Sequence, residues 1–90
     1  MSKTFISLPD RFDSCSVPEL VQCILFRRDE LREIRAFLND PNSRQYPIIR
    51  AKLRLNKFVI KNEVHRINQA RHLLLATGEK NLREYRWNQK

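Results

Sequence analysis

The sequence predicts an all-α protein, a three-helix antiparallel bundle with a short N-terminal arm and a basic C-terminal tail. Apolar residues recur at spacings of three and four over long stretches, which is typical of amphipathic helices, and no stretch alternates convincingly as a strand would. A single glycine in 90 residues is too few for the frequent turns of a β-sandwich. We therefore expect one modest core, with an arm at residues 1–15, a three-helix domain at 16–78 and a tail at 79–90.

The N-terminal arm carries apolar side chains on both sides of Pro9. These residues are Phe5, Ile6, Leu8 and Phe12. Such a segment either packs on the helical domain as an irregular arm or frays as a chain end, and the sequence favours neither.

The first helix should begin after Ser16 and run to about Leu38. Ser16 is a good N-cap, Pro18 suits the first turn, and Glu19 lies three residues after Ser16, which completes a capping box. One face of this helix carries an apolar stripe, as expected for a helix packed on a core. The stripe consists of Val17, Leu20, Val21, Ile24, Leu31, Ile34 and Leu38.

The apolar stripe is interrupted at its centre by Arg27 and Arg28, where the spacing from Ile24 calls for an apolar residue. Guanidinium groups on a core-facing seam are costly unless they reach water or meet an anionic group. The interruption therefore indicates an anionic partner near the middle of this helix.

A second helix should follow the turn cluster at residues 39–43, with Pro47 in its first turn. We expect this helix to end near Lys57, because the residues that follow favour β structure locally. Asn62 should then cap a third helix that stops at Gly78. One bent continuous helix is the alternative, since the pattern is helical on both sides of the junction.

The chain is strongly basic, with a net charge of +8 and a pI of about 10.2. This balance implies an anionic partner, which can be a nucleic acid, an acidic protein or a membrane surface. Basic residues of the first two helices could form one positive surface, whose guanidinium groups suit carboxylates and phosphates. They are Arg27, Arg28, Arg32, Arg35, Arg50, Arg54 and Lys57. A solvated basic face is the alternative.

The sequence favours neither an enzyme nor a metal protein. It holds no glycine-rich phosphate loop and no motif with an activated serine or cysteine. Cys15 and Cys23 are eight residues apart, and His65 and His72 lie far from them, so a zinc site is not expected. No run is long enough to span a bilayer, and residues 1–13 resemble neither a signal peptide nor an Arg-rich transit peptide.

Two motifs resemble those of the LYR-motif family of small mitochondrial proteins. Leu25-Phe26-Arg27 stands where the family has Leu-Tyr-Arg early in its first helix; reading Phe26-Arg27-Arg28 as the triplet is the alternative register. Residues 50–57 (RAKLRLNK) resemble the family segment R-x-x-F-R-x-N-K at the end of the second helix, with Leu53 in the Phe position. The resemblance covers about residues 20–76.

The resemblance implies a non-enzymatic adaptor of the mitochondrial matrix that binds acylated acyl carrier protein. Such adaptors are assembly factors or accessory subunits of respiratory complexes, iron–sulfur cluster machinery, ATP synthase or mitochondrial ribosomes. The carrier supplies the 4′-phosphopantetheine acyl chain, and no cofactor or metal is bound directly. The implied carrier-binding residues are Leu25, Phe26, Arg27, Arg28, Arg32, Arg35, Arg50, Leu53, Arg54 and Lys57. The implied acyl-chain tunnel is lined by Leu20, Ile24, Leu31, Ile49, Ile67 and Leu74.

Two other functions remain open from the residues alone. A basic helical protein could bind nucleic acid through phosphates, with Tyr85 and Trp87 of the tail stacking on bases, although these aromatic side chains could equally close the end of the bundle. A structural subunit could use Phe26 and Phe37, which lie on a second apolar strip of the first helix, for protein contacts only.

Overall fold

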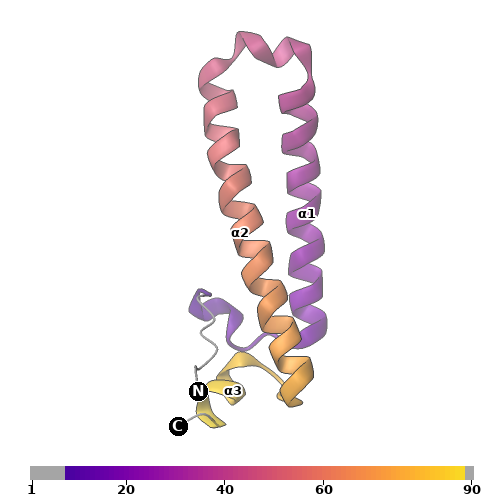
Figure 1. The fold of residues 1–90 in the computed structure, drawn as a ribbon, viewed down its shortest axis with the longest axis vertical. Coiled ribbons are helices and arrows are strands. Elements are labelled where there is room, and N and C mark those ends of the chain that lie inside the picture. The colour runs from indigo at the N-terminus through magenta and orange to yellow at the C-terminus, as the bar shows by residue number, and fades with distance from the viewer. Residues whose placement is uncertain (1–7, 89–90) are drawn as a thin grey trace.

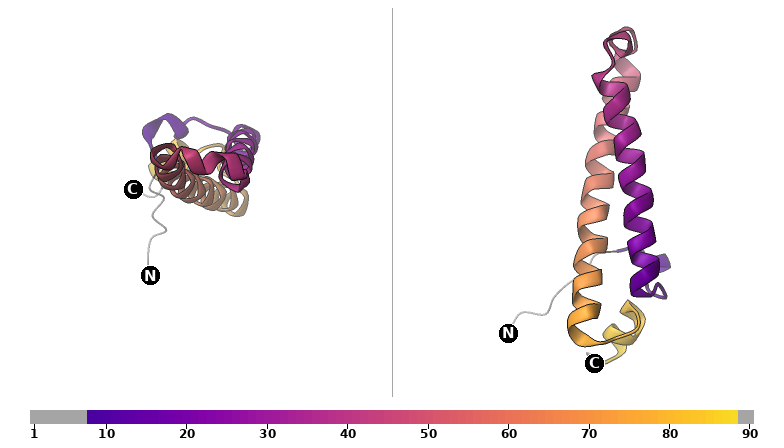
Figure 2. Two further views of the ribbon diagram at one scale, coloured as in Figure 1. Left: turned by 90° about the horizontal axis from the view of Figure 1, so that it is seen from above. Right: turned by 90° about the vertical axis from the view of Figure 1, so that its right-hand side faces the viewer.

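The computed structural model describes residues 8–88, whose regular elements are helices without any strand (Figure 1). Two long helices, α1 (Val17–Asn39) and α2 (Pro47–Thr77), run antiparallel and side by side along a rod of 53 × 24 × 20 Å (Figures 1 and 2). The 3-10 helix η2 (Pro41–Gln45) joins them at one end of the rod. The predicted all-α class is therefore confirmed.

The predicted break between a second and a third helix is wrong, and the continuous-helix alternative is right. α2 extends over 31 residues, and Asn62 lies inside it instead of capping a new helix. Ile60, in the middle of the β-favouring stretch, is buried against Leu31 and Ile34 of α1. This tertiary packing outweighs the local preference, because propensities are small compared with the burial of a large apolar side chain.

The third helix of the molecule comes from the segment expected to be a tail. α3 (Leu82–Asn88) has seven residues and lies with the 3-10 helix η1 (Asp10–Phe12) at the end of the rod away from η2 (Figure 1). Leu82 is fully buried, and the backbone N–H of Arg83 donates to the Asp13 carbonyl oxygen at 3.0 Å. The segments flanking the hairpin therefore belong to the fold.

The start of α1 follows the sequence prediction. The Ser16 hydroxyl accepts the Glu19 backbone N–H at 3.4 Å, and the Glu19 carboxylate accepts the Ser16 backbone N–H at 3.2 Å. These reciprocal bonds form the capping box and satisfy donors that the first turn of a helix otherwise leaves unpaired.

The turn between the long helices is held by a side chain from α2. Arg50 donates to the backbone carbonyl oxygen of Leu38 at 2.9 Å and also to the hydroxyl of Ser43, which is buried. Arg50 thereby caps the C-terminal end of α1, where carbonyl groups lack helical partners. At the other end, α2 stops at Gly78, whose φ of 75° is the left-handed conformation that glycine adopts without strain.

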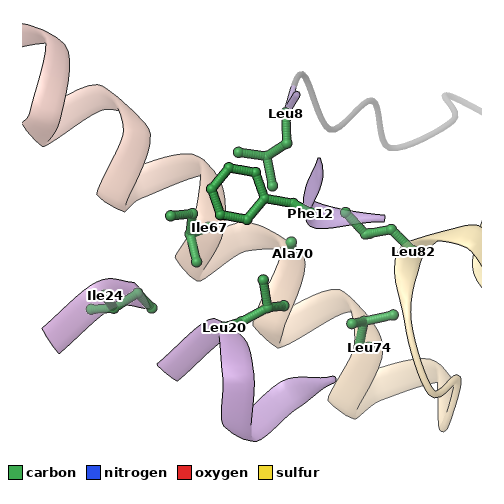
Figure 3. Close-up of a cluster of buried hydrophobic side chains, with 8 residues drawn as sticks. All are labelled: Leu8, Phe12, Leu20, Ile24, Ile67, Ala70, Leu74 and Leu82. Atoms are coloured by element: carbon green, nitrogen blue, oxygen red, sulfur yellow. The ribbon is translucent and has the colours of Figure 1, made fainter. Parts of the chain in front are cut away.

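The core consists of two clusters of buried side chains along the contact between α1 and α2. Leu31, Ile34 and Ile60 form the cluster nearer to η2. The larger cluster joins both long helices to η1 and α3 (Figure 3). It contains Leu8, Phe12, Leu20, Ile24, Ile67, Ala70, Leu74 and Leu82.

The apolar residues of the predicted arm divide into two groups. Leu8 and Phe12 are buried in the larger cluster, so this part of the arm packs on the helices. Phe5 and Ile6 lie outside the described residues. Among residues 8–88, no helix is both long enough and apolar enough to cross a membrane.

Replacing Leu20 with alanine should destabilise the protein strongly. Leu20 has no exposed surface, and a buried leucine-to-alanine change typically costs about 2–5 kcal/mol. The matched control is Leu55→Ala on α2, where the side chain is 71% exposed and the free energy of unfolding should change little. Urea unfolding followed by circular dichroism measures both variants, and equal losses of stability would contradict this description of the core.

The capping box should be visible in the titration of Glu19. Hydrogen bonds from the Ser16 backbone and side chain lower the pKa of Glu19. Because the pKa is lowered in the folded state, the stabilisation is present above the ordinary glutamate pKa and is lost as the pH falls through the lowered value. Ser16→Ala removes the hydroxyl, so NMR titration should show the Glu19 pKa rising toward its ordinary value. Pro18→Ala, which keeps both partners, should leave it low.

Candidate functional site

The two central arginines of α1 point to opposite sides of the contact with α2. The Nε of Arg27 donates to Oε1 of Glu63 on α2 at 2.9 Å, and its Nη1 lies 3.0 Å from Oε2 of Glu30. Arg11 joins the same carboxylate of Glu63 at 3.7 Å. The guanidinium of Arg27 is therefore neutralised within the protein.

The environment of Arg27 keeps it charged despite partial burial. Its side chain is 27% exposed and that of Glu63 is 19% exposed. Burial alone would lower the pKa of Arg27, but the hydrogen bonds and negative charges of Glu63 and Glu30 outweigh it and raise the pKa. The arginine in the apolar stripe thus finds its anionic partner on α2, as a partly buried charge requires.

Arg28 instead lines a hollow of about 520 Å³ on the other side of the hairpin. Leu31 and Val64 also line this hollow and belong to the packed contact between the long helices, so they form its apolar floor. The remaining lining residues are Arg32 and Arg35 of α1 with Lys61, His65 and Asn68 of α2. No carboxylate is among the residues that line it.

A second hollow of about 460 Å³ continues the first toward η2 and shares Lys61 with it. Its other lining residues are Leu38, Arg54, Lys57 and Phe58. We call the two hollows together the basic groove. The cations that line it are Arg28, Arg32, Arg35, Arg54, Lys57 and Lys61.

The positive charge of the basic groove is almost uncompensated within the described residues. The ion pairs found in residues 8–88 include one contact to a groove cation, from Arg32 to Asp29 at 3.8 Å, and both of these side chains are largely exposed. The sequence contains no Asp or Glu between residues 41 and 62. The groove therefore attracts anions, and its apolar floor offers surface for hydrophobic contact as well.

The structure brings five of the predicted carrier-binding residues together in the basic groove and places the other five elsewhere. The five groove residues are Arg28, Arg32, Arg35, Arg54 and Lys57. Arg27 is paired with Glu63, Arg50 holds the turn, and Leu53 packs against the cluster nearer to η2. Leu25 is half exposed, and Phe26 is 64% exposed on the side of the hairpin that carries Arg27.

Sequence reasoning missed Lys61 and His65. Both follow Lys57 at intervals of four residues, which places them on one face of a continuous helix. The spacing was visible in the sequence, but a break predicted between Lys57 and Asn62 separated Lys57 from the other two residues. Treating α2 as one helix would have extended the predicted basic surface by two turns.

The predicted acyl-chain tunnel residues do not line one open channel among the described residues. Leu20, Ile24, Ile67 and Leu74 belong to the larger core cluster, where they pack against one another (Figure 3). Leu31 belongs to the other cluster. Ile49 lies near the start of α2 and is about half exposed. An acyl chain that entered between the helices would have to displace these packed side chains.

The side of the hairpin opposite the basic groove carries a third hollow, of about 420 Å³, next to Arg27. Phe12, Cys15, Cys23 and Phe26 give it a mainly apolar lining. Burial raises the pKa of the Cys15 thiol, and the neighbouring Cys23 and Glu19 raise it further. The described residues contain no cluster of His, Cys, Asp and Glu that could hold a metal ion, and both thiols are free.

The Arg27–Glu63 pair should contribute to stability more than an exposed pair of the same type. A double-mutant cycle with Arg27→Met and Glu63→Gln should give a coupling free energy of about 1 kcal/mol. The control cycle with Arg32→Met and Asp29→Asn should give below about 0.3 kcal/mol, because this pair is longer and exposed. Urea unfolding at moderate salt measures both cycles, and equal couplings would refute the structural role assigned to Arg27.

The two possible registers of the Leu-Tyr-Arg-like triplet place its arginine on different sides of the hairpin. In the register 25–27 the arginine is the internally paired Arg27, whereas in the register 26–28 it is Arg28, which lines the basic groove.

Comparison with known proteins found no match for this chain among protein-family models, curated proteins or solved structures.

Proposed function

We propose that this protein is a non-enzymatic adaptor that binds an acidic helix of a partner protein in the basic groove. The observation that carries the proposal is the gathering of six cations from two helices over an apolar floor, with no carboxylate among the lining residues. Cations gathered with almost no compensating carboxylates repel one another, and an anionic partner relieves this repulsion. The partner that we propose is acyl carrier protein.

The size of the basic groove suits a short helix. Arg28 and Leu38, which mark its two ends on α1, are ten residues apart and therefore about 15 Å apart along the helix axis. A partner helix of about three turns would span this length. Its carboxylates would pair with guanidinium and ammonium groups at the rim, while an apolar side chain would contact Leu31 and Val64. Such a helix needs acidic residues along one face.

The resemblance to LYR-motif proteins supports acyl carrier protein as the source of the acidic helix. A carrier also brings a phosphate in its 4′-phosphopantetheine arm, which guanidinium groups of the groove can bind. The core between the helices is closed, so we propose that docking at the basic groove comes first and that the acyl chain enters by separating α1 and α2. On the same resemblance we propose the mitochondrial matrix as the location and a larger complex as the client.

The structure gives less support to nucleic acid as the partner. Tyr85 packs against the larger core cluster, which favours a role in closing that end of the fold over stacking on a base. Trp87 is exposed, but it belongs to α3 at the end of the rod away from η2 and from the Leu38 end of the groove. Of the two aromatic residues that could stack on bases, only Trp87 is therefore well exposed.

Charge reversal in the basic groove should weaken binding of acyl carrier protein. Arg28→Glu and Arg35→Glu should each raise the Kd by at least about tenfold, because the partner's carboxylates then face a negative charge. Lys80→Glu is the matched control, since it makes the same change of charge at an exposed residue outside the groove. Isothermal titration calorimetry with carrier bearing an acylated arm, and with carrier lacking the arm, measures the three variants.

Two results would overturn this proposal. Equal loss of affinity in all three variants would show that only net charge matters. Binding of RNA that exceeds binding of the carrier, falls steeply with salt and is abolished by Arg28→Glu would assign the basic groove to nucleic acid.

A further inference from the structure

The outer face of α2 exposes large apolar side chains along its first half. Ile48, Leu55 and Phe58 are 72%, 71% and 67% exposed. On the same helix Ile60 is buried against α1, and Leu53 is packed beside it. α2 is therefore apolar both toward α1 and away from it, which a helix needs only if both faces have partners.

The exposed apolar residues follow a heptad repeat. With Ile48 at position a, the next a position is Leu55, and the d positions are Ala51 and Phe58. The f positions of this repeat, which lie opposite the a and d seam, are Leu53 and Ile60. Because these two residues pack toward α1, the a and d positions form a seam on the outer side of α2, and Phe58 lies at its edge, where it also lines the basic groove.

The residues beside the seam carry only positive charge. Lys52 occupies an e position, Arg54 and Lys61 occupy g positions, and the remaining e position is Val59, which is 58% exposed. No ion pair joins Lys52, Arg54 or Lys61 to a carboxylate within residues 8–88. In coiled coils the charges at e and g select the partner, so this seam requires a helix with negative charges at those positions.

We propose that residues 48–62 of α2 form a coiled-coil seam for one helix of a second protein, with aliphatic residues at a and d and with Asp or Glu at e and g. Asn62, at the next a position, can fix the register of the pair. A second copy of this chain is disfavoured because its Lys52 and Arg54 would lie against cations. An anionic membrane is disfavoured because the stripe is a narrow seam and not a broad apolar face.

This seam adjoins the basic groove, with which it shares Phe58, Arg54 and Lys61, but it does not depend on the function proposed for the groove. Ile48, Leu55 and Lys52 belong to the seam alone, whereas Arg28 belongs to the groove alone. Arg54 and Lys61 form the ridge between the two surfaces, so one row of cations can serve two acidic partners. An adaptor that joins two proteins needs two such surfaces.

The test uses two synthetic helical peptides of about three heptads with identical leucines at a and d. One carries Glu at every e and g position, and the other carries Lys. The full-length protein should bind the Glu peptide at least about tenfold more tightly than the Lys peptide, as measured by fluorescence anisotropy. Lys52→Glu should reduce this preference about threefold, and by more than the matched reversal Arg28→Glu, which removes only what the basic groove contributes to peptide binding.

Leu55→Asp should weaken binding of the Glu peptide at least about tenfold, because it places a charge in the centre of the seam. Leu75→Asp is the matched control, since Leu75 is exposed on α2 outside the seam. The proposal is overturned if both peptides bind equally, or if Leu55→Asp has no effect. It is also overturned if sedimentation shows a dimer that Leu55→Asp dissociates, or if vesicles containing phosphatidylserine bind the seam while neither peptide does.

Discussion

The packing of Ile60 against Leu31 and Ile34 is the interaction on which the rest of this structure depends. It holds α2 helical through a stretch whose local preference is for β structure, and so makes one helix of 31 residues out of two expected shorter ones. Because α2 is one continuous helix, the helical repeat fixes the direction in which each of its side chains points. Lys57, Lys61 and His65 align on the face toward the basic groove, and the heptad residues align on the outer face.

The sorting of positive charge in α1 follows from the same contact. Arg27 and Arg28 are adjacent in the chain, yet one is held by Glu63 and the other lies in a groove without a carboxylate. Successive residues of a helix are about 100° apart, so neighbours on either side of a packed seam emerge on opposite sides of the hairpin. One arginine thereby contributes to stability, and the other is available to a partner.

The parts of the fold that depend on local chemistry could be predicted from the sequence. The capping box at Ser16, Pro47 in the first turn of α2 and Gly78 as the stop all follow from short-range hydrogen bonding and backbone preference. The sequence offered a continuous α2 only as the alternative to a break, because the choice between them depends on Ile60 meeting a helix about thirty residues earlier. The same limitation hid Lys61 and His65 from the candidate site, and it left the pairing of Arg27 with Glu63 unforeseen.

The closure of the larger core cluster has a consequence for folding during synthesis. The hairpin of α1, η2 and α2 can form while the chain leaves the ribosome, since its two long helices are joined by a short turn. Leu8 and Phe12, however, pack in a cluster that also contains Leu82, and Arg83 donates to the Asp13 carbonyl oxygen. The cluster around Leu8 and Phe12 is therefore complete only after Leu82, about seventy residues downstream, has been synthesised. A chain stalled before residue 82 would leave these apolar side chains partly uncovered and prone to non-native contacts.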